Sequence, residues 1–249
     1  MIGVCVSVPI ACFRKGMARE YLETYDYPPP STCYGFLLSL VGEVDRNAHI
    51  GVRVTFALRH RSERSVILRT KWRIKNAKVH PGVGTNRCPD YQQLLTQCDL
   101  VIWLDSSEEP RLTEGLPTLE SRVRTALDPS TRGQIERFGG LSLGESTHLV
   151  NEVSLFDSEK EPNVSPASRE TETERYDAME DRVPLLFLSE EQGGTEDTIE
   201  DRNWPSERIT LPVWVDHVGA TKTRYVTGIL VPGNLVPANL ERIPKIVSA

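Results

Sequence analysis

Residues 28–42 read Pro28-Pro-Pro-Ser-Thr-Cys-Tyr-Gly-Phe-Leu-Leu-Ser-Leu-Val-Gly42, a stretch that predicts a short buried helix. Proline disfavours a helix because it lacks an amide hydrogen, so the helix is expected after the prolines, with Ser31 or Thr32 as its N-cap. Gly42 is a typical residue to end it. Between these limits, large side chains recur at helical spacing and predict one core-facing side: Tyr34, Leu37, Leu38 and Val41.

Strand patterns lie on both sides of this helix. Every second residue is apolar in residues 2–10, 50–58 and 66–74, as in half-buried strands. The apolar run Leu100-Val-Ile-Trp-Leu104 is typical of a central strand, and a second helix is expected just before it, near residues 89–97. The order strand, helix, two strands, helix, strand predicts an α+β, ferredoxin-like βαββαβ unit over about residues 1–105. A further helix is expected after Pro117, with one shared face: Leu119, Val123 and Leu127.

Positive charge is concentrated in one part of a chain whose net charge is −6. Residues 53–78 hold nine Lys or Arg against a single acid, Glu63. We interpret residues 50–78 as a long β-hairpin, a thumb, with a basic tip at residues 59–64. Trp72 belongs to the apolar face of its second strand and is expected in the core, while four cations alternate on the other face: Arg69, Lys71, Arg73 and Lys75. Such a face suits a polyanion; an ordinary solvated sheet face is the alternative.

The second half of the chain is acidic. Residues 157–202 hold fifteen Asp or Glu and five Lys or Arg, with one apolar island at residues 183–188. We expect loops on both sides of the island and strands again at residues 209–215 and 225–231. The chain is therefore divided into a domain of residues 1–150 and an acidic, irregular region with a reduced C-terminal β part at residues 151–249.

Residues 138–146 form a glycine-rich segment, Phe138-Gly-Gly-Leu-Ser-Leu-Gly-Glu-Ser146. Its three glycines allow a close approach of another chain and can offer backbone N–H groups to phosphate, although an ordinary turn is the alternative. The segment also matches the GxSxG nucleophile elbow around Ser142. A serine hydrolase is disfavoured, because the residues before the elbow are mostly polar and no suitable acid and histidine follow.

The cysteines and the hydropathy limit the class of protein. Five scattered cysteines form no CxxC pair, which favours a reducing cytosol over a disulfide framework and gives no reason to expect zinc or another cofactor. No apolar run of about 18 residues is present, so no membrane span is expected. The N-terminus lacks the pattern of a signal peptide, and we expect a cytoplasmic protein.

Together these motifs resemble the fifth family of CRISPR-associated (Cas) proteins, which are RAMP-fold subunits of the type I Cascade complex. The resemblance rests on the N-terminal strand, on Pro28–Glu43, on the glycine-rich Phe138–Val150, and on the basic hairpin in the place of the family's thumb. It covers residues 1–150 well and the rest loosely. Among the subtypes it is most similar to type I-B, in particular the Myxan-type branch.

This resemblance implies a non-catalytic subunit that caps the 5′ handle of the crRNA and inserts its thumb between handle and spacer. It also implies contacts with the first backbone subunit and the large subunit of Cascade, and with target DNA only indirectly, near the PAM end. Carried onto this chain, the implied RNA-binding residues lie after the first strand, at the helix start, on the thumb and in the glycine-rich segment: Arg14, Lys15, Ser31, Thr32, Tyr34, Arg59, Arg61, Arg64, Arg69, Lys71, Arg73, Gly139, Gly140, Ser142 and Gly144.

A metal-independent pre-crRNA endonuclease is the main alternative, since one subtype of this family cleaves its own RNA. Such cleavage needs an oriented base, an acid and a cation near the phosphate. His60 or His80, with Lys71 or Lys75 and a nearby tyrosine, supplies the residue types, but no motif places them together.

Overall fold

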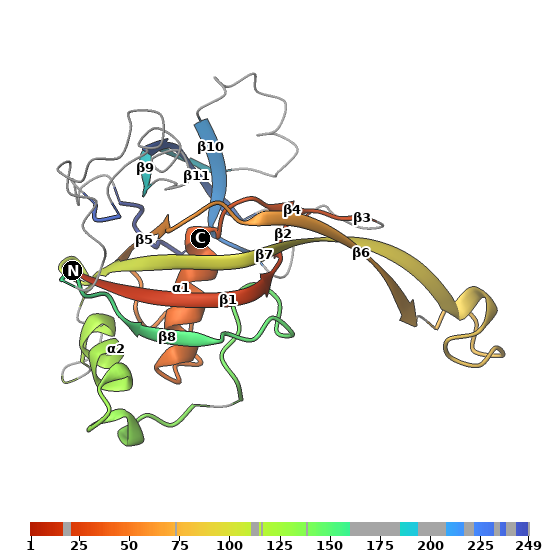
Figure 1. The fold of residues 1–249 in the computed structure, drawn as a ribbon, viewed down its shortest axis with the longest axis horizontal. Coiled ribbons are helices and arrows are strands. Elements are labelled where there is room, and N and C mark those ends of the chain that lie inside the picture. The colour runs from red at the N-terminus through yellow and green to blue at the C-terminus, as the bar shows by residue number, and fades with distance from the viewer. Residues whose placement is uncertain are drawn as a thin grey trace, which may run out of the picture.

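A long strand, β7 (Arg87–Asp105), runs through the centre of the main sheet and out into a projecting arm (Figure 1). On one edge it pairs antiparallel with β1 (Ile2–Ala11), which pairs in turn with β8 (Glu152–Leu155). On the other edge it pairs first with β6 (Glu63–Trp72) and then with β5 (Arg53–Leu58), both antiparallel. The computed structural model describes residues 1–16, 21–72, 74–110, 115, 117–137, 139–159, 185–193, 208–216, 222–231, 235–237 and 243–248.

The predicted βαββαβ order is present, but it extends to β8 (Glu152–Leu155) and does not end near residue 105, because its third strand, second helix and fourth strand are not the predicted ones. In chain order the elements are β1, α1 (Pro30–Leu40), β5, β7, α2 (Leu119–Leu127) and β8. The helix expected near residues 89–97 is wrong: these residues belong to β7, because β6 offers them a ladder of ten paired residues. The second helix of the unit is instead the one expected after Pro117, and Thr118 is its N-cap.

The expected hairpin of residues 50–78 is also wrong. β5 and β6 do not pair with each other but follow one another along the same edge of β7, joined by residues 59–62. The arm is made of β6 and the first half of β7, and the chain turns at its tip between Trp72 and Arg87. Residues 59–64, expected at the tip, therefore lie at the base of the arm.

Helix α1 covers one face of the sheet and supplies much of the core. Its predicted core-facing residues are all buried: Tyr34, Leu37, Leu38 and Val41. The predicted cap is wrong, because Pro29 is the N-cap, Pro30 is already helical, and no side chain caps the helix. Gly42 ends the helix as predicted, with a φ of 71° that favours glycine, and a Cβ there would lie 1.9 Å from the carbonyl oxygen of Glu136.

A small second sheet packs against the N-terminal end of α1. It consists of β9 (Leu185–Gly193), β11 (Arg224–Val231) and β10 (Arg208–Trp214), all antiparallel with β11 in the middle. The last two confirm the strands expected at 209–215 and 225–231. The acidic residues 160–184 and 194–207 lie outside the described part of the chain.

Short elements complete the described structure. Strand β2 (Phe13–Arg14) pairs with β4 (Thr24–Tyr25), and β3 (Tyr21–Leu22) runs parallel to β7. Two 3₁₀ turns, η1 (Gly84–Asn86) and η2 (Arg132–Gln134), lie at the arm tip and after α2. No helix in the described ranges has the length and hydrophobicity needed to cross a membrane.

Candidate nucleic-acid interface

A pocket of about 380 Å³ lies along α1, from Ser31 to Ser39. Its walls come from α1, from the glycine-rich segment and from the end of β10. Five of the residues implied by the family resemblance line it: Ser31, Thr32, Tyr34, Ser142 and Gly144. The tertiary structure thus joins two separate segments of the sequence into one concave surface.

Arg46 supplies the charge of this pocket. Its guanidinium lies 3.8 Å from the centroid of the Trp214 ring, and its Nη2 donates to the carbonyl oxygen of Val215 at 2.9 Å. The hydroxyl of Tyr34 donates to the backbone carbonyl of Arg46 at 2.9 Å. Sequence reasoning missed Arg46 and Trp214, since no local pattern connects two residues that meet only in the folded chain.

Tyr34 forms part of the buried wall of the pocket. Its ring is buried in the core, and burial raises the pKa of its hydroxyl above the usual range. The hydroxyl of Ser31 donates to the carbonyl oxygen of Pro212 at 2.9 Å, which ties α1 to β10. Both residues therefore help to build the pocket wall.

The glycine-rich segment is a tight loop packed on the end of β1. Gly139 and Gly144 have φ values of 78° and 88°, and a Cβ at Gly144 would lie 2.5 Å from the carbonyl oxygen of Cys12. Ser142 forms a single β-bridge with Leu149, so it does not occupy the strand-to-helix turn that a nucleophile elbow requires. Gly140, like Gly139, is exposed on this loop.

The cations at the arm are partly neutralised by acids from other parts of the chain, although residues 53–78 themselves hold only the acid Glu63. Arg64 pairs with Asp26, and the Lys71 ammonium lies 2.9 Å from the buried carboxylate of Asp90. Arg69 donates to Gln92 and lies 3.4 Å from Glu145 of the glycine-rich loop. Arg69 thereby connects the arm with the loop that lines the pocket. Arg73, another implied cation, lies outside the described residues.

The apolar face of the arm is exposed, so the core position expected for Trp72 is wrong. The side chain of Trp72 is 71% exposed, and Leu68 and its cross-strand partner Tyr91 are 61% and 54% exposed. On the opposite face Arg69 is paired with Asp90 in the ladder. The arm therefore has one apolar and aromatic face and one polar, cationic face.

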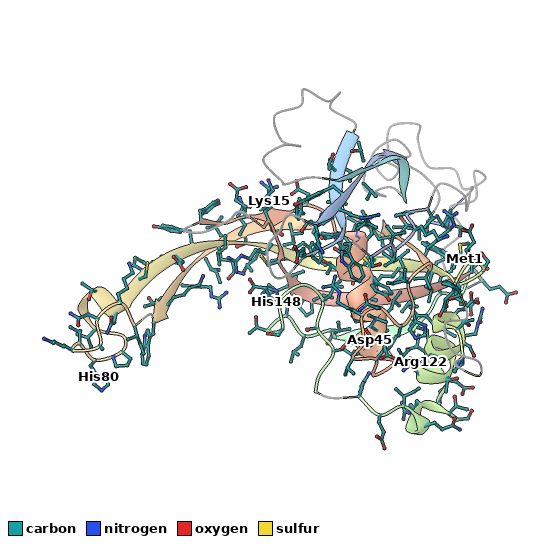
Figure 2. All side chains as sticks on the ribbon, turned by 180° about the vertical axis from the view of Figure 1, so that it is seen from behind. Met1, Lys15, Asp45, His80, Arg122 and His148 are labelled. Carbon is teal, nitrogen blue, oxygen red and sulfur yellow. The ribbon has the colours of Figure 1, made fainter. Side chains whose placement is uncertain are left out.

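The remaining implied cations lie near the base of the arm. Arg14 is exposed on β2, and Lys15 (Figure 2) is 3.2 Å from Glu23 and lies over the ring of Tyr25. Arg59 donates to the Cys5 sulfur at 3.2 Å, and Arg61 is exposed.

The histidines weighed for RNA cleavage are not brought together. His60 lies at the arm base, with Nε2 2.7 Å from the carbonyl oxygen of Gln97. His80 lies at the far tip of the arm (Figure 2). Lys71, one of the two lysines weighed with them, is held by Asp90. Among the described residues, the hydrogen bonds of His60 and His80 go to backbone carbonyls and not to Lys71, Lys75 or a tyrosine.

A buried cluster holds the loop that carries Arg46. His49 is fully buried, and its Nδ1 lies 2.5 Å from Glu109. Arg122 of α2 bonds both the His49 Nε2 at 2.9 Å and Glu43 at 2.6 Å. No local sequence pattern predicts this cluster, and its burial assigns it to support of the fold.

A curated protein is similar to this chain over nearly its whole length. The chain is 43% identical over 246 residues to the CRISPR-associated protein Cas5 of Myxococcus xanthus (strain DK1622), which covers 99% of this chain and 97% of that protein. No family model matches.

The comparison with solved structures confirms the predicted α+β fold. A chain of a CRISPR RNA-guided surveillance complex superposes with a TM-score of 0.50 and 11% identity over 97% of this chain and 95% of that chain. A second structure, the crystal structure of a Cas protein, has a TM-score of 0.39 and 13% identity over 98% and 97% of the two chains.

Proposed function

We propose that this chain, which belongs to the Cas5 family of CRISPR-associated proteins, is a non-catalytic Cascade subunit that holds the 5′ handle of a guide RNA. The observation that carries the proposal is the pocket between α1 and the glycine-rich loop. It gathers hydroxyl groups and the Arg46 guanidinium, which are groups that bind phosphates and unpaired bases.

Continuity between the pocket and the arm supports a path for single-stranded RNA. Gly144 lines the pocket, and the next residue, Glu145, reaches Arg69 on the polar face of the arm. Lys71 lies two residues farther out on the same face. A strand of RNA that leaves the pocket over the glycine-rich loop would meet these cations in turn.

Ion pairs on this path set up a competition for the cations. The carboxylates of Asp90 and Glu145 hold Lys71 and Arg69 in the free protein, so a phosphate that binds either cation competes with an acid of the protein itself. Binding through such cations makes the affinity depend on salt.

The apolar face of the arm supports placement in a larger assembly. Four large exposed side chains on one face, those of Val66, Leu68, Trp72 and Tyr91, are typical of a surface that packs against another molecule. In the proposed complex this partner is the first backbone subunit, and the large subunit contacts the body of the protein. Target DNA is contacted by these two subunits near the PAM end, and by this chain only indirectly.

The proposal is tested with the full chain and a single-stranded RNA carrying the repeat-derived 5′ end of a guide. We expect salt-dependent binding and intact RNA after incubation with EDTA. Absence of binding would refute the proposal. Specific cleavage that is abolished by His60→Ala or His80→Ala would instead establish the alternative function, a pre-crRNA endonuclease. No observation on the described residues favours that alternative.

A further inference from the structure

Gly35 lies in the middle of α1 and has no evident reason within the protein to be glycine. A Cβ built at this position has no atom within 4 Å, so packing does not require its absence. Its φ is not positive, so the backbone does not require glycine either. A glycine inside a helix is less favourable than alanine, so this position lowers helix stability without an internal benefit.

The space in front of Gly35 is the pocket itself, since Gly35 is one of its lining residues. Gly42 provides the contrast, because its positive φ and the nearby Glu136 carbonyl both require glycine. Because residue 35 has no side chain, the pocket keeps space beside α1 that a bound molecule can occupy.

Arg46 forms the charged wall of the same pocket. The Trp214 ring beneath it is only 7% exposed, so Trp214 itself offers little surface to a ligand. The bond to Val215 orients the guanidinium plane over that ring. A guanidinium that rests on an aromatic ring presents its second face for stacking, and nucleobases stack on such planes.

We propose that this pocket takes one unpaired nucleotide of the guide RNA, with its base stacked on Arg46 and its backbone passing over Gly35. The inference rests on the proposed function and deepens it. The volume of about 380 Å³ lies at the small end of the range for ligand sites, which is consistent with one nucleotide rather than a duplex. Among the described lining residues only Arg46 is charged, which suits a ligand that carries a phosphate.

The first test adds side chains at residue 35. Binding of the fluorescein-labelled 5′ guide RNA to the full chain is measured by anisotropy for Gly35→Ala and Gly35→Leu, together with thermal unfolding. We expect Gly35→Leu to weaken binding by about tenfold, the loss of one stacked base, and Gly35→Ala by less. Both variants are expected to melt at or above the wild-type temperature.

Gly133→Ala is the matched control. Gly133 also has no atom within 4 Å of a built Cβ and a φ outside the positive range, but it lies in η2 and not in the pocket. Its replacement is expected to leave RNA binding unchanged.

The second test identifies the nucleotide. Each base of the RNA is removed in turn, and one abasic position is expected to weaken binding to the wild type but not to Arg46→Ala. Equal losses in both proteins at every position would overturn the stacking on Arg46.

The outcomes separate this inference from the function on which it rests. Wild-type protein that does not bind the RNA overturns both. Wild-type binding with undiminished binding by Gly35→Leu overturns the nucleotide pocket alone. A lowered melting temperature of Gly35→Ala overturns the premise, because it would show that glycine is needed by the fold itself.

Discussion

Arg69 of the arm and Glu145 of the glycine-rich loop form an ion pair, with Nη1 3.4 Å from Oε2. The pair joins two segments that the sequence separates widely, and it lies where the proposed RNA path leaves the pocket. Both side chains are partly exposed, so solvent screens the attraction and the pair adds little to stability. Its main effect is on RNA binding, because Glu145 pairs with the Arg69 guanidinium that a phosphate would otherwise contact.

Glu145→Gln is therefore expected to tighten RNA binding. Loss of the carboxylate removes a competing anion and its repulsion of phosphate, and a gain of about threefold at low salt is expected from a screened pair of this kind. The measurement is a salt titration of RNA affinity. Glu152→Gln on the exposed part of β8 is the control and should change nothing; unchanged affinity in Glu145→Gln would place RNA elsewhere.

Arg69→Ala should have the opposite effect. A cation that contacts a phosphate of single-stranded RNA releases counterions, so its removal lowers the slope of log affinity against log salt by roughly 0.7. The loss should be similar for different RNA sequences, because a phosphate carries no sequence information. An unchanged slope would remove the polar face of the arm from the interface.

Trp72→Ala is expected to leave the folded chain intact. The side chain is largely exposed, and surface substitutions change the free energy of unfolding by no more than about 0.5 kcal/mol. Trp103→Ala is the contrast: Trp103 is buried and its Nε1 donates to Leu235 at 2.7 Å, so about 3–5 kcal/mol should be lost. Urea denaturation distinguishes the two.

The same Trp72→Ala variant should weaken joining to the neighbouring Cascade subunit. This outcome follows from the proposed function, and co-purification with that subunit measures it. Unimpaired assembly would show that the apolar face of the arm is not the contact surface.

Acid should destabilise the protein partly through Glu109. Burial by itself would raise the pKa of this carboxyl, but hydrogen bonds from His49, the Leu119 amide and Ser106 lower it below the ordinary value of 4.5. A lowered pKa in the folded state means that the stabilisation is complete above the unfolded value and is lost as pH falls through the folded one. Unfolding free energies measured from pH 6 downward should thus fall more steeply for the wild type than for Glu109→Gln.

Local periodicity in the sequence predicted a strand and a helix, but β1 is not half-buried as expected, because all residues of Ile2–Val6 are buried and Ile10 is exposed. The alternation of residues 2–10 predicts β1, the spacing of Tyr34, Leu37, Leu38 and Val41 predicts α1, and Gly42 marks its end. These predictions are confirmed because side-chain direction follows directly from the period of a strand or helix. The glycine-rich segment was also identified from sequence, since a positive φ strongly favours glycine.

Only the tertiary structure decided which strands pair and which residues meet. An alternating pattern predicts that residues 66–72 form a strand, but it does not say whether the partner is β5 or residues 87–96, which themselves become strand through that pairing. For the same reason Ser31 bonds Pro212 instead of capping its helix, and Arg46 stacks on Trp214. The pocket depends on contacts between residues as many as 181 positions apart, and no local pattern in a single sequence encodes such contacts.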